Sequence, residues 1–116
     1  REHPNATGGG NKYHARRTWS DLCQREFDSM SEARHGEGLV GRQRAGEIAD
    51  LEYQPAWVLS DRPGLKVKVK ADFRYLDLAT EEVVVEDVKG RETAASRVKR
   101  AWLMDKFGIE VRVVWV

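Results

Sequence analysis

The chain has 116 residues, of which 41% are hydrophobic and 34% charged, and its formal net charge is +1. This length predicts one small domain, and this composition is that of a globular protein rather than a disordered or membrane-spanning one. The single cysteine excludes an internal disulfide and a zinc site made of several cysteines, which fits a reducing, cytoplasmic setting. Because basic and acidic residues nearly balance, net charge alone does not indicate a nucleic-acid partner.

Residues 1–15 predict a flexible basic arm, because a run of three glycines lies among polar residues, and residues 16–116 predict a single folded domain. Residues 17–20 and 25–27 predict a short hairpin. Basic side chains near this junction, close to a tyrosine and a tryptophan, suit contacts with a DNA backbone. A basic tail that only aids solubility is the alternative. The basic side chains are Lys12, Arg16 and Arg17.

A first helix is predicted over residues 30–45, ending near Gly46. Ser29 and Glu32 have the spacing of a capping box, in which each side chain bonds to the backbone amide of the other residue. Three glycines inside the helix each cost roughly 1 kcal/mol relative to alanine. The helix therefore needs tertiary packing, or its glycines allow another part of the chain to approach closely.

Three strands are predicted next. Residues 51–59 form a strand that Pro55 interrupts, which favours an edge strand or a bend. After a turn at residues 61–64, apolar and polar side chains alternate over residues 66–76, and a further strand covers residues 83–89. Because short turns connect these strands, we expect them to pair antiparallel.

A second helix is predicted over residues 92–107, capped by Gly108, and a final strand over residues 109–116. The final strand is almost continuously apolar, which predicts a central, buried position in the sheet. It follows a helix, so we expect it to pair parallel after a right-handed crossover. The helix residues expected to face the core are Ala94, Ala95, Val98, Ala101, Trp102 and Met104. The tryptophans expected in the core are Trp57, Trp102 and Trp115.

Residues 84–90, Val-Val-Glu-Asp-Val-Lys-Gly, contain the most informative pattern. Side chains alternate along a strand, so Asp87 and Lys89 share one face and Glu86 points to the other. Asp72 ends the preceding alternating run. Two carboxylates can hold Mg²⁺, and a lysine can position water or stabilise charge on a phosphorane. The pattern predicts a metal-dependent phosphodiesterase centre, and the alternatives are an acid paired with a basic neighbour and a lysine that faces solvent.

This order of elements, together with these residues, resembles the PD-(D/E)XK nuclease superfamily and, within it, a family of small predicted endonucleases from phages and prophages. The likeness lies in residues 11–13, 27–34, 51–55, 71–73 and 85–90. It implies an α/β (α+β) fold, with a restriction-endonuclease-like αβββαβ core in which helices flank a mixed central sheet.

Carried over position by position, the resemblance implies that Asp72 and Asp87 bind Mg²⁺ or Mn²⁺ and that Lys89 is the lysine of the superfamily. Glu32 matches the acid on the first helix, although a purely structural role as a helix cap is the alternative. The chain has Ala71 where the name of the superfamily has a proline.

The activity that the resemblance implies is that of a structure-selective DNA endonuclease, a phage resolvase of Holliday junctions or other branched DNA that leaves 5′ phosphates in the cytoplasm of a bacterial host. Two symmetric cuts need two sites, so we expect a homodimer. One alternative is a general duplex or single-strand nuclease subunit of a larger complex. Another is a non-catalytic DNA-binding protein that retains the nuclease fold.

Two further residues are candidate DNA contacts. Gln54 can reach the site from the neighbouring strand, and its alternative role is to satisfy the backbone around Pro55. Lys99 on the second helix can reach a phosphate, and its alternative is a solvated surface position. The scattered spacing of the histidines does not indicate a metal site; they are His3, His14 and His35.

Overall fold

Two helices and eight strands follow one another along residues 16–116, the part of the chain that the structure, a computed structural model, describes. The predicted arm at residues 1–15 lies outside the described residues. The elements are β1 (Thr18–Ser20), β2 (Arg25–Phe27), α1 (Met30–Arg44), β3 (Ile48–Tyr53), β4 (Ala56–Arg62), β5 (Leu65–Lys70), β6 (Phe73–Asp77), β7 (Glu82–Lys89), α2 (Ala94–Phe107) and β8 (Val111–Trp115).

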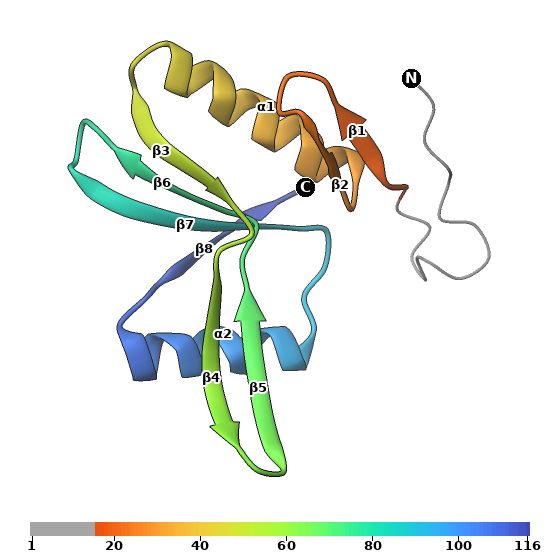
Figure 1. The fold of residues 1–116 in the computed structure, drawn as a ribbon, viewed down its shortest axis with the longest axis vertical. Helices are drawn as coiled ribbons and strands as arrows, with labels where there is room; N and C mark the ends of the chain where they lie inside the picture. Colours follow the sequence, from red (N-terminus) through yellow and green to blue (C-terminus); the bar gives the residue numbers. More distant parts are fainter. Residues whose placement is uncertain (1–15) are drawn as a thin grey trace.

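The central sheet has four strands in the order β3-β6-β7-β8 (Figure 1). β6 pairs antiparallel with both β3 and β7, whereas β8 pairs parallel with β7, as predicted. The fold is therefore α+β with a mixed sheet. The expectation that residues 109–116 form a central, buried strand is wrong, because β8 is the last strand in this order. Its end is open to solvent, with Trp115 56% exposed and Val116 64% exposed.

One face of this sheet packs against α1 and the β1–β2 hairpin. The predicted cap is present, because the Ser29 side chain accepts a hydrogen bond from the Glu32 amide at 3.1 Å. Gly36 gives α1 its close approach to the sheet: a Cβ at this position would lie 3.0 Å from Phe27 and 3.1 Å from Phe73. Burying an aromatic or branched side chain of this kind contributes roughly 1.5–3 kcal/mol. The buried cluster comprises Phe27, Ala33, Leu39, Ile48, Phe73 and Tyr75.

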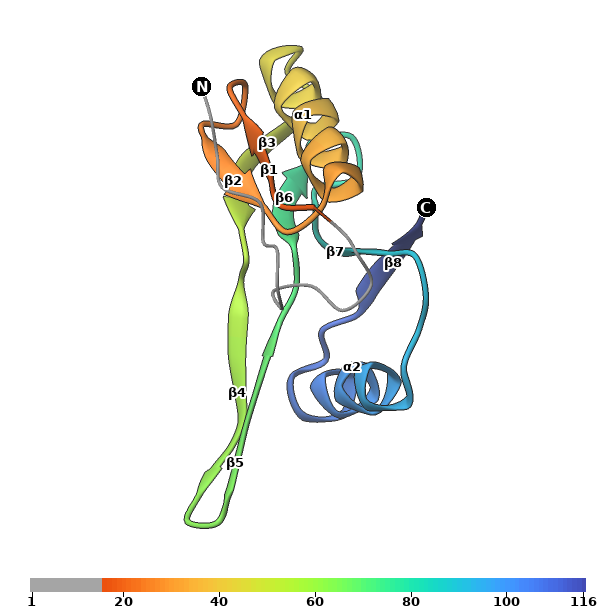
Figure 2. The same ribbon diagram turned by 90° about the vertical axis from the view of Figure 1, so that its right-hand side faces the viewer.

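The β4–β5 hairpin leaves this sheet as a separate two-stranded arm (Figure 2). Pro55 separates β3 from β4, as the predicted bend requires, and Gln54 before it has a left-handed backbone with φ of 53°. The single alternating strand predicted over residues 66–76 is instead two strands. It breaks at Ala71 and Asp72, where the chain passes from the arm into the central sheet.

Helix α2 starts at the Thr93 cap and ends at Gly108, whose φ of 68° is the left-handed conformation predicted there. Its predicted core face is wrong, because only Leu103 is buried, whereas Val98 is 61% exposed. The reason is that α2 packs against the β4 arm, where Lys106 Nζ donates to the Leu59 carbonyl at 2.7 Å. One narrow stripe is therefore covered. Ala94, Ala95, Ala101 and Met104 are exposed and Trp102 is half-buried.

The expectation that three tryptophans lie in the core is also wrong. Trp57 and Trp102 are half-buried and Trp115 is exposed. Neither helix in the described part of the chain has the length and apolarity that a membrane span requires.

Candidate functional site

Three carboxyl groups meet where the β4–β5 arm joins the central sheet. Asp72 lies at the break between β5 and β6, and its Oδ2 accepts a hydrogen bond from the Val88 amide at 2.7 Å. Burial raises the pKa of Asp72 to about 8, with further contributions from the negative charges of Asp87 and Glu32. Burial is the larger cause of this rise, and repulsion among the three acids is the smaller one.

Glu32 contributes its carboxyl group to this cluster from the first turn of α1. Its side chain is buried, since the residue is 7% exposed, and it shares a hydrogen bond with Asp72. Burial and then the charge of Asp28 raise the pKa of Glu32 to about 7, although Arg25 opposes them. Of the two roles considered, the backbone amide of Glu32 serves the cap and its carboxyl group joins the acids.

Asp87 and Lys89 lie on the same face of β7, as strand alternation predicts. Lys89 Nζ lies 3.1 Å from Asp87 Oδ2, and both side chains are less than one-fifth exposed. This ion pair holds the ammonium group beside the carboxyl cluster. It also offsets part of the charge that the three acids would otherwise bring together.

Glu86 points to the opposite face of β7 and is 3% exposed. Its carboxylate lies 2.7 Å from His35 Nε2 and 2.9 Å from the Tyr75 hydroxyl, and it also accepts from Arg112. Burial alone would raise the pKa of Glu86, but these hydrogen bonds outweigh it and lower the pKa to about 2. Glu86 therefore stabilises the packing of α1 and β8 on the sheet, and the choice of Asp87 over Glu86 as the site residue agrees with this geometry. His3 and His14 lie outside the described residues.

The carboxyl cluster has the donor chemistry that Mg²⁺ or Mn²⁺ prefers, because all its ligands are hard oxygen atoms. Within residues 16–116, however, no group of three or more His, Cys, Asp or Glu side chains is placed to hold a metal ion. Lys89 faces one oxygen of Asp87, and the Val88 amide donates to one oxygen of Asp72. The raised pKa values of Asp72 and Glu32 reflect burial and nearby negative charge, which a cation would offset as protons do.

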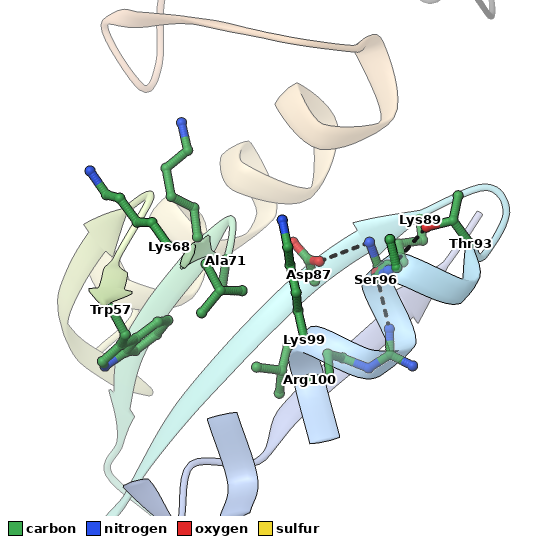
Figure 3. Close-up of a pocket in the computed structure, with 13 residues that line it drawn as sticks. Trp57, Lys68, Ala71, Asp87, Lys89, Thr93, Ser96, Lys99 and Arg100 are labelled. Carbon is green, nitrogen blue, oxygen red and sulfur yellow. Dashed lines mark hydrogen bonds and ion pairs between the residues drawn. The ribbon is translucent and has the colours of Figure 1, made fainter. Parts of the chain in front are cut away.

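Asp87 and Lys89 open into a cavity of about 580 Å³ between the β4–β5 arm and α2 (Figure 3). We call this cavity the basic cleft. Its arm wall carries Trp57, Lys68 and Lys70, and its α2 wall carries Lys99 and Arg100. Lys99, predicted as a phosphate contact, lines the same cavity as Asp87 and Lys89. The other four side chains were not predicted as site residues. Three alternate lysines before Asp72, at positions 66, 68 and 70, were a signal of positive charge near the site.

The other predicted DNA contacts within residues 16–116 do not line the basic cleft. Arg17 lies directly before β1, where it pairs with Glu26 and Asp28, each at 3.0 Å. Arg16 is exposed just before β1, and Lys12 lies outside the described residues. Gln54 touches the site through its backbone, because its amide donates to the Asp72 carbonyl at 2.9 Å. The contact is made by the backbone, so both roles considered for the Gln54 side chain stay predictions.

Comparison with known proteins identifies a family and no individual relative. No curated protein and no solved structure matches the chain significantly. A family model described as "Protein of unknown function (DUF1064)" matches residues 10–116, and the chain therefore belongs to the DUF1064 family.

Proposed function

We propose that this protein is a metal-dependent DNA endonuclease of the PD-(D/E)XK type. The observation that carries the proposal is the convergence of three acids and one lysine at the end of β7, where the basic cleft opens. Burial first, and then nearby negative charge, raise the pKa of Asp72 to about 8 and that of Glu32 to about 7, so the cluster is short of positive charge. Strongly perturbed carboxyl groups beside a cleft favour a functional role over a purely structural one.

In this proposal Asp72, Asp87 and Glu32 hold Mg²⁺ or Mn²⁺. The ion, when bound, supplies Lewis acidity toward phosphodiester oxygens and water. Lys89 lies 3.1 Å from Asp87, so its ammonium group is placed to stabilise the negative charge that a phosphodiester gains during attack by water. The Val88 amide holds Asp72 at 2.7 Å, which keeps that carboxyl group oriented toward its neighbours.

Branched DNA is the substrate that we propose, with the protein acting as a homodimer. Symmetric cutting of two strands requires two sites, and each chain supplies one carboxyl cluster. A non-catalytic DNA-binding protein is the second candidate, because no three His, Cys, Asp or Glu side chains in residues 16–116 are placed to hold a metal ion. Against it, these acids would repel a phosphate backbone once they ionise, above about pH 8, unless a cation neutralised them.

The test is cleavage of an end-labelled four-way junction beside a linear duplex of matched sequence, with Mg²⁺, with EDTA, and with Asp87→Asn. Asp105→Asn is the matched control, since Asp105 is an exposed acid of α2 outside the basic cleft. We expect paired cuts in the junction that EDTA and Asp87→Asn abolish and Asp105→Asn preserves. Equal cutting of both substrates would leave a general nuclease. Binding without cutting, at equal strength with and without Mg²⁺, would favour the non-catalytic candidate.

A second variant separates catalysis from affinity. Lys89→Ala should lower the cleavage rate by about 100-fold or more with little change in DNA binding, because the lysine acts on charge that develops during attack. A loss confined to affinity would reassign Lys89 to phosphate binding. Unchanged cleavage would remove it from the site.

A further inference from the structure

The basic cleft has more positive charge than the carboxyl cluster needs. Lys68 and Lys70 on the arm and Lys99 on α2 are exposed, and no carboxylate among residues 16–116 forms an ion pair with them. Arg100 differs, because it pairs with Glu92 and also reaches Ser96. Three lysines are therefore available to a ligand with negative charge.

The spacing of these lysines suits a ligand with repeated charges. Lys68 and Lys70 share one face of β5, about 7 Å apart along the strand. This separation is comparable to that of consecutive phosphates along an extended nucleic-acid strand. Lys99 lines the same cavity from α2, and Figure 3 shows Lys68 on the arm and Lys99 on the helix. A polyanionic strand that lies along the cleft would meet lysines from both walls.

Trp57 adds an aromatic surface to the same cleft. The guanidinium group of Arg74 lies 5.8 Å from the centroid of its ring, and Glu52 holds Arg74 with contacts of 2.6 and 3.2 Å. Trp57 also lines a second cavity, which Arg74 borders. Trp57 therefore lies between this second cavity and the basic cleft. An indole that is held from one side can stack with a nucleobase on the other. Such stacking together with basic side chains is typical of sites for single-stranded nucleic acid.

Stacking on Trp57 separates unpaired from paired substrates. Inside a duplex the faces of each base are covered by the neighbouring bases, so a base that stacks on this ring must lie outside a duplex. Asp87 and Lys89 line the same cavity, so a strand bound there passes the carboxyl cluster.

We propose that the basic cleft binds an unpaired nucleic-acid strand, with Lys68, Lys70 and Lys99 on backbone phosphates and a base stacked on Trp57. The inference rests on the proposed function and narrows its substrate class to nucleic acid that is unpaired at the cut, as in a splayed junction arm, a flap or a gap. Lysine and indole recognise DNA and RNA strands alike, and the binding arms of the test distinguish the two sources.

The test is fluorescence anisotropy in EDTA, which needs no cleavage, with labelled oligothymidylate, oligouridylate and a duplex of equal length. The wild-type protein should bind at least one of the single strands more tightly than the duplex. Trp57→Ala should weaken single-strand binding roughly tenfold, Trp57→Phe should keep most of it, and Trp115→Ala, the exposed control, should change it less than about twofold. The tighter-bound single strand identifies the substrate as DNA or RNA.

The salt dependence of binding tests the lysines separately. Replacing Lys68 and Lys70 with glutamine should lower the slope of log affinity against log salt by about 1.4, because each phosphate contact in a single strand contributes about 0.7. The control is Arg44→Gln, an exposed change at the far end of α1 that should leave the slope unaltered. An unchanged slope in the double variant, equal binding of duplex and single strands, or unaltered binding by Trp57→Ala would each overturn the inference.

The two proposals fail in different ways. If single strands bind as expected in EDTA but Mg²⁺ produces no cutting, the proposed nuclease function fails and the binding inference stands. If a fully paired duplex is cut as fast as a flap, and Trp57→Ala cuts at the wild-type rate, the inference fails and the nuclease function stands.

Discussion

Asp72→Asn should stabilise the protein at high pH, because it removes a carboxylate from a crowded and largely buried position. Burial, followed by Asp87 and Glu32, raises the pKa of Asp72 to about 8. The substitution keeps the shape of the side chain. Its amide oxygen can still accept from the Val88 amide, which lies 2.7 Å from Asp72 Oδ2, and its NH₂ group can donate to the neighbouring acids. Asparagine is thus a permanent mimic of protonated Asp72.

The magnitude follows from linkage between protonation and folding. A carboxyl group whose pKa is higher in the folded protein than in the unfolded chain contributes stability that is complete at low pH and is lost as pH rises through the folded value. The pKa of Asp72 rises from its ordinary value of 3.8 to about 8, a shift of about four units. At about 1.4 kcal/mol per unit, this shift changes the free energy of unfolding by at most about 6 kcal/mol. Because the basic cleft admits water beside Asp87, we expect roughly 2–3 kcal/mol.

The assay is urea unfolding in EDTA at about pH 5 and about pH 9, followed by circular dichroism. The difference in free energy of unfolding between Asp72→Asn and the wild-type protein should grow by roughly 1.5–2 kcal/mol in favour of the variant between the two pH values, because about three of the four units lie above pH 5. Asp105→Asn, on the exposed side of α2, should show no such growth. Parallel pH profiles for Asp72→Asn and the wild type would refute the crowding of the acids.

Further predictions concern the metal and the glycines of α1. Mg²⁺ should raise the melting temperature of the wild-type protein at neutral pH. It should also release protons, because it displaces them from Glu32 and Asp72, whose pKa values are about 7 and about 8. Calorimetry in buffers of different ionisation enthalpy measures both effects, and Asp72→Asn should show neither. Gly36→Ala should destabilise the fold by about 1 kcal/mol or more, because the new Cβ would lie 3.0–3.2 Å from two phenylalanine rings. Gly38→Ala, which meets nothing within 4 Å, should instead stabilise it by roughly 0.5–1 kcal/mol in the same urea unfolding experiment. Equal effects at the two glycines would contradict the packing of α1 against β2 and β6.

The carboxyl cluster links acidity to any metal-dependent function. Protons on Glu32 and Asp72 compete with a divalent ion for the same oxygens, so affinity for the ion should rise with pH through the range of about 7 to 8. Glu86, on the other face of β7, does not take part in this competition. Its pKa of about 2 keeps it ionised at every pH in that range.

Much of the candidate site was predictable because it depends on local rules. Alternation along β7 separates Asp87 and Lys89 from Glu86, and the structure places them on opposite faces as expected. The Ser29 cap and the left-handed Gly108 follow from the needs of helix ends, which neighbouring residues satisfy. The double role of Glu32 was not decidable in this way, because its amide and its carboxyl group serve different partners.

The sequence by itself therefore determined which residues of β7 share a face, how the two helices are capped, and that Asp87 and Lys89 lie together. Only the tertiary structure decided which neighbour covers each face. The apolar pattern of a helix is the same whether the helix packs on a broad sheet or on a narrow arm, and α2 packs on the arm and exposes Val98. An apolar strand likewise fits a central or an edge position, and β8 lies at an edge. Likewise Lys68 and Trp57 reach the cleft beside Asp87 because the chain breaks at Asp72 and turns the arm toward α2, a contact between distant segments that periodicity does not encode.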